Sequence, residues 1–267
     1  MIYQEYQPIE PLSDYIQLIW IAESESPDDH YPREKILPDG IVEIVFHFGD
    51  PFITYNAAGE TLIQPQGFAI SQMQKFIEIE SNGAIGFVSV RFYPWGAHHF
   101  FEKPVNEFID NTIELNHLWG DDYKNVLQQI KNVNNNEKVN IIQLFLSKCL
   151  SKYRKDDHAI DDAIKLIRDL KGQCSVRQVS DKVNLNLKQL ERKFLKAVGT
   201  TPKTFSRTTR FLYLCHHLQE YENKTMAQLA YELGYYDQAH FIRDFKAFSG
   251  LTPKAYYQHN NICFADF

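Results

Sequence analysis

Two arginines, Arg192 and Arg243, occupy equivalent places in two stretches of sequence that lie 51 residues apart. Each follows an apolar residue by two positions and precedes a phenylalanine by two, so in a helix turning ~100° per residue it lies roughly opposite the apolar side. A guanidinium group in that position is suited to donate two parallel hydrogen bonds to guanine, the commonest specific contact in the major groove. The pattern therefore predicts that both stretches read bases of double-stranded DNA.

Neighbouring positions on the same two faces carry further polar side chains. We predict DNA contacts from Lys188, Gln189, Glu191, Arg192 and Lys196 in the first stretch and from Gln238, His240, Arg243 and Lys246 in the second. Because the two sets differ, one chain is expected to read an asymmetric promoter site. Charged residues opposite an apolar stripe are often simply hydrated. An arginine at the same place in two aligned copies favours base recognition instead.

Both stretches have the signals of a helix-turn-helix unit. Ser175 and Thr225 are each followed three residues later by Gln, which is the capping box that starts a helix. Asn184 and Gly234 then suit a turn that needs a positive φ. The predicted N-caps and terminating glycines of the second helices are Asn186 and Gly199 in the first copy and Asp237 and Gly250 in the second. A repeated supersecondary unit follows from these offsets.

The buried side of the second helices and the link between the copies are also predictable. The expected apolar stripes are Leu187, Leu190, Phe194 and Ala197 in the first copy and Phe241, Phe245 and Phe248 in the second. From Pro202 to about Gln219 the sequence lacks Gly and internal Pro, which predicts one connecting helix. A helix of ~17 residues spans ~25 Å, a length suited to holding two units on adjacent turns of the major groove.

The stretch from about Asp157 to Asn260 resembles the DNA-binding domain of AraC/XylS-type bacterial transcription regulators. The resemblance rests on the run from Ala230 to Lys246, AYELGYYDQAHFIRDFK, and on Gly250-Leu-Thr-Pro253 behind it. Arg210-Phe211 is also similar to the family pattern, whereas Leu214 and Asn184 replace the usual Ala and Gly. The resemblance implies a regulator that binds promoter DNA, responds to a small-molecule effector and, if it is an activator, contacts RNA polymerase.

The charge is uneven and divides the chain into two predicted domains. Residues 1–154 carry 11 Lys and Arg against 21 Asp and Glu, a net charge of −10, and residues 155–267 carry 17 against 13, a net charge of +4. An acidic half joined to a basic half is typical of a sensor attached to a nucleic-acid binder. The start of the chain has no signal-peptide pattern and no apolar run approaches ~18 residues, so a cytoplasmic protein without a membrane partner is expected.

The N-terminal half is expected to be an antiparallel β-barrel or sandwich followed by helices, giving an α+β protein with an all-α C-terminal domain. Short strands between turns are predicted from Ile36 to about Tyr93, at 41–48, 52–55, 76–80 and 85–92. A short helix running into a strand is expected from Leu12 to Trp20, and helices are predicted over 121–131 and 137–153. The apolar face of the second helix suits either packing or dimerisation, so a homodimer is left open. This half also resembles the barrel-plus-helices sensor domain of one AraC-type subgroup, through Ile36-Leu-Pro-Asp-Gly40 and Arg91-Phe-Tyr-Pro-Trp-Gly96.

The N-terminal half has little recognisable chemistry. His47, His98, His99 and His117 do not form the His-x-His…Glu pattern of metal-binding barrels, so no metal and no cofactor are predicted, and no catalytic residue is assigned. An aromatic interior is suited to a small apolar ligand, and Arg91, Trp95 and His47 are the predicted contacts. For Arg91, a structural ion pair with a carboxylate is the alternative. The alternatives for the domain are a metal-independent enzyme and a protein-interaction module without a ligand.

Overall fold

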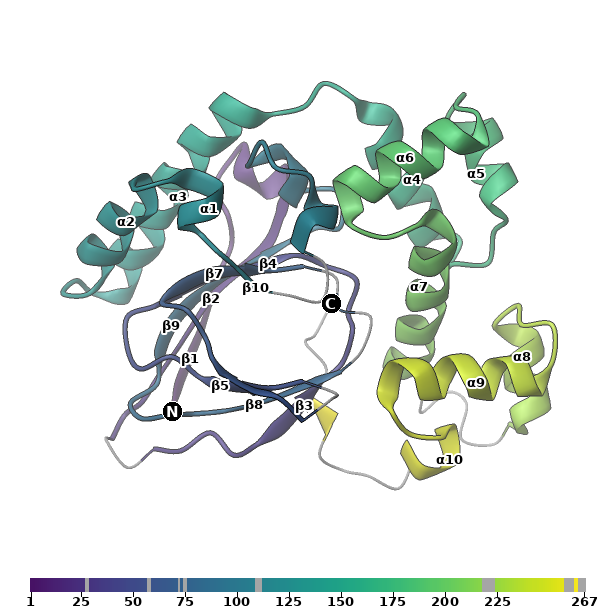
Figure 1. The fold of residues 1–267 in the computed structure, drawn as a ribbon, viewed down its shortest axis with the longest axis horizontal. Helices are drawn as coiled ribbons and strands as arrows, with labels where there is room; N and C mark the ends of the chain where they lie inside the picture. Colours follow the sequence, from purple (N-terminus) through teal and green to yellow (C-terminus); the bar gives the residue numbers. More distant parts are fainter. Residues whose placement is uncertain are drawn as a thin grey trace.

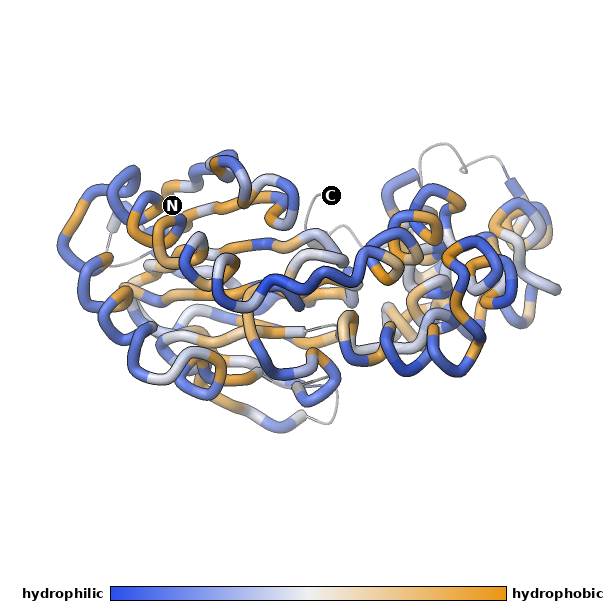
Figure 2. The backbone as a smooth tube through the Cα atoms, turned by 90° about the horizontal axis from the view of Figure 1, so that it is seen from above, coloured by the Kyte–Doolittle hydropathy of each residue, from blue (hydrophilic) through white to orange (hydrophobic). Residues whose placement is uncertain are grey.

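The computed structural model describes residues 1–26, 29–56, 59–71, 73, 76–108, 112–217, 224–256 and 262–263. Its N-terminal part consists of two β-sheets with attached helices, and its C-terminal part is helical, as predicted (Figure 1). Seen from above, the two parts lie side by side, and apolar segments run along the strands (Figure 2). Among the described residues, none of the helices combines the length and the apolar character needed to cross a membrane.

The larger sheet contains six strands in the order β1-β2-β9-β4-β7-β10, and every neighbouring pair is antiparallel. Its strands are β1 (Ile2–Tyr6), β2 (Ile16–Glu23), β4 (Glu43–His47), β7 (Gly67–Ile70), β9 (Gly86–Phe92) and β10 (Thr112–Glu114). The short 3-10 helix η1 (Leu12–Asp14) leads into β2, which agrees with the predicted helix running into a strand.

The smaller sheet contains five strands in the order β11-β3-β8-β5-β6. Its strands are β3 (Glu34–Ile36), β5 (Ile53–Tyr55), β6 (Thr61–Ile63), β8 (Ile77–Glu80) and β11 (Ile262–Cys263). All pairs are antiparallel except β11 with β3. The two sheets do not close into one barrel, so of the two predicted architectures the sandwich describes this half better.

The larger sheet separates two environments because side chains alternate between its faces. Ile44 and Phe46 of β4 and Val88 and Val90 of β9 are fully buried on the face that helices cover. The residues between them point toward the smaller sheet. Aromatic side chains consequently occur on both faces, whereas the prediction placed them in a single interior.

Three helices cover the outer face of the larger sheet: α1 (Asn116–Trp119), α2 (Asp122–Ile130) and α3 (Asn135–Tyr153) (Figure 1). The predicted apolar stripe of α3 is buried against the sheet and α2, with Ile142 and Leu146 fully inaccessible. Phe145 also contacts Trp119, with the ring centroids 4.9 Å apart. The apolar stripe of α3 is therefore a packing face within the chain and not a free dimerisation surface.

The C-terminal helices follow the predicted repeat. They are α4 (His158–Asp169), α5 (Val176–Lys182), α6 (Leu187–Val198), α7 (Pro202–His216), α8 (Met226–Glu232), α9 (Gln238–Ser249) and α10 (Pro253–Tyr256). Ser175 and Thr225 form complete capping boxes, and Asn184 and Gly234 have φ values of 54° and 69°. The connecting helix α7 is continuous, and its predicted extension beyond 217 lies outside the described residues.

The buried stripe of α6 differs from the prediction at two positions. It follows Leu190, Phe194 and Val198, each at most 1% exposed. Leu187 is 48% exposed because it is the first residue of the helix and lies beyond the packed turns. Ala197 is half-buried at the edge of the stripe, since residues spaced by four stack on one side of a helix. The predicted stripe of α9, Phe241, Phe245 and Phe248, is buried throughout.

Candidate nucleic-acid interface and cavity

The outward face of α6 is held in place by its cap and its buried stripe. The Asn186 side chain accepts a hydrogen bond from the Gln189 backbone N–H at 2.9 Å, and Gln189 Oε1 accepts one from the Asn186 N–H at 3.1 Å. Leu190 and Phe194 anchor the other side in a core with α4 and α5. The predicted contact residues Lys188, Gln189, Glu191, Arg192 and Lys196 are all exposed. Gln189 thus serves as a cap as well as an exposed polar group.

The outward face of α9 is built in the same way with different side chains. Asp237 caps the helix by accepting a hydrogen bond from the His240 N–H at 2.7 Å. Gln238, Arg243 and Lys246 are exposed. His240 is half-buried, with Nε2 3.8 Å from Asp244 Oδ2 and its ring 5.3 Å from that of Tyr235. Of the predicted contacts on α9, His240 is therefore the least accessible.

A partly buried ion pair that the sequence did not reveal fixes α9 to α7. Arg207 donates from Nε to Asp244 Oδ2 at 2.9 Å and from Nη2 to Asp244 Oδ1 at 2.7 Å. Asp244 is 4% exposed, and its hydrogen bond raises the pKa of Arg207 above the ordinary value. A bidentate arginine–carboxylate pair of this kind fixes the relative orientation of the two side chains as well as their distance. The pair therefore fixes how α9 lies on the connecting helix.

Two exposed tyrosines also lie beside α9. Tyr231 is 85% exposed in α8, and Tyr236 is 94% exposed in the turn before α9. Tyr236 is the inserted residue that changes the repeat offset from 50 to 51, because Leu185 and Tyr235 make the same backbone hydrogen bond to the carbonyls of Ser180 and Ala230. That change of offset was the available signal for Tyr236. Phenol groups beside a recognition helix are suited to phosphate contacts.

The first helix-turn-helix unit packs directly on the sheet part. Helix α6 contacts the 3-10 helices η2 (Ala97–His99) and η3 (Val105–Phe108). Lys193 Nζ lies 2.6 Å from Asp157 Oδ2, just before α4. Arg192 remains exposed in this arrangement. The sheet part therefore holds α6 without covering its outward face.

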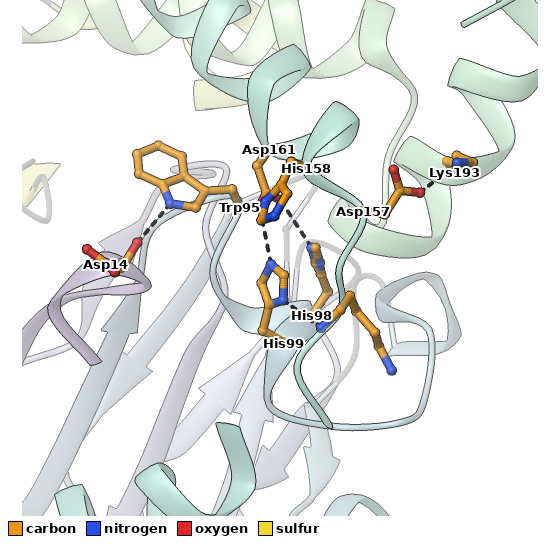
Figure 3. Close-up of polar contacts among 9 residues, drawn as sticks. Asp14, Trp95, His98, His99, Asp157, His158, Asp161 and Lys193 are labelled. Carbon is orange, nitrogen blue, oxygen red and sulfur yellow. Dashed lines mark hydrogen bonds and ion pairs between the residues drawn. The ribbon is translucent and has the colours of Figure 1, made fainter. Parts of the chain in front are cut away.

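Two histidines of the sheet part meet an aspartate of α4 at this contact (Figure 3). His98 Nε2 lies 3.3 Å from Asp161 Oδ1, and His99 Nε2 lies 3.4 Å from Asp161 Oδ2. All three residues are buried. Burial lowers the pKa of His98 to about 3, and the neighbouring His99 adds to that effect. His98 is therefore neutral in the folded protein at physiological pH.

The same three side chains have the composition of a metal site, with one ligand atom each within 4.8 Å of one another. The proton on His99 decides against that role. His99 Nδ1 accepts a hydrogen bond from the Lys155 backbone N–H at 3.0 Å, so in the neutral ring the proton is on Nε2. Nε2 then carries the proton and has no free lone pair for a metal, and it approaches Asp161 Oδ2 at 3.4 Å without forming a hydrogen bond. The cluster is better explained as a polar contact between the two parts, in which His98 and Asp161 form the hydrogen bond.

Trp95, a predicted ligand contact, lies at this junction. Its ring stacks on that of Tyr93, with the centroids 4.6 Å apart. Its Nε1 donates to the Asp14 carbonyl at 3.0 Å (Figure 3). Lys165 of α4 places Nζ 5.0 Å from the ring centroid. The structure thus places Trp95 against α4 and apart from Arg91 and His47.

Arg91 and His47 both line a cavity of about 370 Å³ between the two sheets. Its walls are the inward residues of β4 and β9 together with apolar side chains of the smaller sheet, such as Ile77 and Ile79. Aromatic side chains form much of the lining: Tyr3, Trp20, Tyr31, Phe52, Phe68 and Phe87. A mainly apolar cavity with a few polar groups is the usual form of a small-molecule site.

One end of the cavity is charged. Arg91 Nη2 lies 3.2 Å from Asp39 Oδ2, and Arg91 Nε lies 3.7 Å from Glu43 Oε1. Glu43 Oε1 also accepts a hydrogen bond from Trp20 Nε1 at 3.0 Å. Burial raises the pKa of Asp39 to about 6, and Arg91 opposes that rise. Arg91 therefore makes the structural ion pair that was the alternative to an anionic ligand.

The other end of the cavity is uncharged. His47 Nε2 lies 3.0 Å from Gln64 Oε1, while Gln64 Nε2 donates to Thr54 Oγ1 at 3.1 Å. Gln64 oxygen can only accept, so the His47 proton is on Nε2. Burial lowers the pKa of His47 to about 4. His47 Nδ1 is then a buried acceptor without a hydrogen-bond partner among the described residues.

The loop between β3 and β4 connects the cavity to the helical part. Asp39 in this loop lines the charged end of the cavity. Leu37 is 4% exposed and packs in the core of the second unit with Phe211 of α7. Gly40 lies against α7, where an added Cβ would be 3.5 Å from Thr208 Cγ2. A displacement of this loop therefore reaches the connecting helix directly.

Two family models match parts of the chain. Residues 4–114 match a domain of unknown function (DUF6597), and residues 179–259 match a helix-turn-helix domain. No curated protein matches the chain. The second match covers α6 to α10 and so includes both predicted recognition helices.

Several solved structures are similar over part or all of the chain. A 1.65 Å structure of ToxT from Vibrio cholerae is 12% identical with a TM-score of 0.45, covering 96% of this chain and 98% of that chain. Unsaturated fatty acid bound ToxT from Vibrio cholerae strain SCE256 is 14% identical with a TM-score of 0.45, covering 91% and 94%. The C-terminal domain of AraT, a response regulator from Geobacillus stearothermophilus, is 19% identical with a TM-score of 0.36, covering 41% and 91%. With TM-scores below 0.5, these likenesses do not decide function.

Proposed function

We propose that this chain, which contains a helix-turn-helix DNA-binding domain of AraC type, regulates transcription by binding an asymmetric promoter site under the control of a small molecule. The observation that carries the DNA-binding part is the equivalent exposure of Arg192 and Arg243 on two recognition helices held by one connecting helix. The 15 residues of α7 extend ~22 Å, which suits two units that enter successive major-groove segments.

The DNA-binding part is tested with Arg192→Ala and Arg243→Ala on a duplex that the full chain selects from a randomised pool. Each variant is expected to lose ~1–3 kcal/mol of binding free energy on the selected duplex and much less on a scrambled duplex at the same salt concentration. Base preference should relax in a different segment for each variant. Lys148→Ala, at an exposed position on α3, is the charge-changing control.

Equal losses on selected and scrambled duplexes would assign both arginines to phosphate contacts and remove them from specific recognition. Unchanged affinity on both duplexes would mean that the two outward faces do not bind DNA. Circular dichroism of the variants separates either result from misfolding.

The sensing part rests on the cavity and on the loop that joins it to α7. A filled cavity would have no room for a ligand, so Val45→Phe, on the inward side of β4, is the direct test. The neutral fluorophore 1-aminoanthracene is expected to bind the wild-type chain and to bind Val45→Phe at least tenfold more weakly. If the wild-type chain binds neither this probe nor any of the ligands tested below, that result would count against sensing and would leave the DNA-binding proposal intact.

A further inference from the structure

We propose that the cavity selects a small aromatic cation whose ammonium group lies beside Asp39 and Glu43. This inference rests on the proposed sensing function and specifies the chemistry of the ligand. Three independent features of the cavity support it: the balance of charges at one end, the excess of hydrogen-bond acceptors, and the aromatic walls.

The charged end of the cavity has more negative than positive groups. Asp39 and Glu43 both face Arg91, and these three groups sum to −1 when ionised. The described lining also includes the Glu5 carboxylate and the Met1 ammonium group, and that ammonium group is paired with Glu25 and Asp29. An anionic ligand would have to displace Asp39 from Arg91 and would remain beside Glu43, whereas a cation relieves the repulsion between the two carboxylates.

The uncharged groups of the cavity also favour a ligand that donates hydrogen bonds. His47 Nδ1 is an acceptor because the proton on Nε2 is used by Gln64. His47 is 1% exposed, so this acceptor is shielded from bulk water. Ser89 Oγ, fully buried between the two ends, also has no hydrogen-bond partner among the described residues. A ligand N–H would satisfy the His47 acceptor, and the Ser89 hydroxyl can either accept from such a ligand or donate to it.

The walls suit an aromatic body with a positive end. Trp20 packs edge-on against Phe87, with centroids 4.8 Å apart, and the same Trp20 holds Glu43 through its indole N–H. Aromatic faces attract cations as well as apolar groups. Glu43 and His47 are four residues apart on β4, a separation of ~13 Å. The cavity is therefore matched to an elongated ligand with an ammonium group at one end and a donor toward the other.

Binding of such a ligand acts on the loop that touches α7. An ammonium group that pairs with Asp39 competes with Arg91 for the same carboxylate. Asp39 lies between Leu37 and Gly40, which contact the second unit and α7. The ligand and DNA should consequently change each other's affinity by the same factor, since coupling between two binding sites is reciprocal.

The inference is tested with three probes of nearly equal shape: 1-naphthylmethylamine, 1-naphthylmethanol and 1-naphthylacetate, which are cationic, neutral and anionic at pH 7.5. Calorimetric titration of the full chain should give at least tenfold tighter binding for the amine than for the carboxylate. Glu43→Gln and Asp39→Asn should each weaken the amine about tenfold and leave the alcohol within about twofold. Glu114→Gln, exposed on β10 and outside the cavity, should leave all three unchanged.

The outcomes separate this inference from the proposed function. Tightest binding of the carboxylate overturns the cationic ligand and leaves sensing intact. Equal binding of the amine and alcohol, with no effect of Glu43→Gln or Asp39→Asn, overturns it in the same way. If none of the three probes binds while 1-aminoanthracene does, the cationic ligand is again excluded and the cavity remains a sensor site. If 1-aminoanthracene also fails, sensing itself is excluded. Thermal unfolding of both carboxylate variants identifies any loss caused by misfolding.

Discussion

The two helix-turn-helix units have the same backbone plan, yet they attach to the sheet part by different chemistry. The first unit, α5 and α6 with α4, is held by the polar contact of His98 and His99 with Asp161 and by Trp95, which packs at the edge of its core. The second unit, α8 and α9, meets apolar side chains, because Leu37 enters its core and Phe76 lies against Gly250. At Gly250 an added Cβ would come within 2.6 Å of the Phe76 ring.

This difference indicates which unit is exposed to a signal from the cavity. Leu37 belongs to the same loop as Asp39, which lines the charged end of the cavity. The contact at Asp161 involves residues outside the cavity lining. Ligand binding should therefore act first on α7 and the second unit, whereas the loss of stability at low pH that comes from keeping His98 neutral belongs to the contact with the first unit. The following changes test whether the two units differ in this way or behave as one body.

The largest effect is expected from truncating the phenylalanine that anchors each recognition helix. Phe194 and Phe245 are each at most 1% exposed, so Phe194→Ala and Phe245→Ala should each cost about 3–5 kcal/mol of unfolding free energy. Helix α7 contributes Phe205 to the first core and Phe211 to the second, which couples the units. Hydrogen exchange should therefore increase in both α6 and α9 for either variant. Exchange confined to the mutated unit would show that they unfold separately.

The second largest effect is expected from breaking the ion pairs at the equivalent positions Asp244 and Lys193, which should differ in their contribution to the unfolding free energy. Arg207→Ala leaves the buried Asp244 carboxylate without its fork and should cost about 3 kcal/mol, since Asp244 is 4% exposed. Lys193→Ala breaks an ion pair with Asp157 whose side chains are 36% and 44% exposed and should cost less than about 1 kcal/mol. Urea unfolding measures both. Similar losses would mean that the two ion pairs contribute alike.

A third effect concerns the pH dependence of the first attachment. Folded His98 has a pKa of about 3, whereas the unfolded residue titrates near 6.5, so between these values the unfolded state binds more protons and stability falls as the pH is lowered. At pH 5 this amounts to about 2 kcal/mol. His98→Gln, which keeps a donor for Asp161, should remove that part of the loss. The difference in unfolding free energy between pH 7.5 and pH 5 measures this contribution in the wild type and the variant. An equal difference in both proteins would contradict the assignment to His98.

The helical part was largely predictable because its signals are local. Caps such as Ser175 and Asp237, and the glycines that end the recognition helices, depend on a few neighbouring residues. The pair of Arg207 with Asp244 was missed because it depends on how two helices cross. The inserted Tyr236 was missed although the change of repeat offset pointed to it. Leu187 was wrongly assigned to the core because periodicity alone does not show where a packed face stops.

The sheet part was predictable only in outline. Strands β4, β5, β8 and β9 were expected, whereas β1, β3, β6, β7 and β10 were not, because the alternation of apolar and polar residues is weak in their sequences. Arg91 and His47 were predicted as ligand contacts, and both line the cavity, while their partners Asp39 and Gln64 come from other strands and loops. Pairing between distant segments is a property of topology, which the local pattern does not contain.

The smallest effect tests the turn where the two units use different residues. Asn184 and Gly234 both have left-handed backbone conformations, with φ of 54° and 69°. Asn tolerates this region at a modest cost, and Gly has none, so Asn184→Gly should change stability by less than about 0.5 kcal/mol, while Gly234→Ala should destabilise by about 1 kcal/mol. Space is not the cause at Gly234, because an added Cβ would come no closer than 3.4 Å to Gln173. Thermal unfolding of the two variants and of Asn184→Ala gives the comparison. If Gly234→Ala and Asn184→Ala lower the stability by the same amount, the two turns impose the same backbone strain. Asn184 then destabilises the first unit relative to a glycine at that position. If Gly234→Ala loses nothing, the turn relaxes away from positive φ, and the second unit is more deformable than the first, as a unit that receives the ligand signal should be.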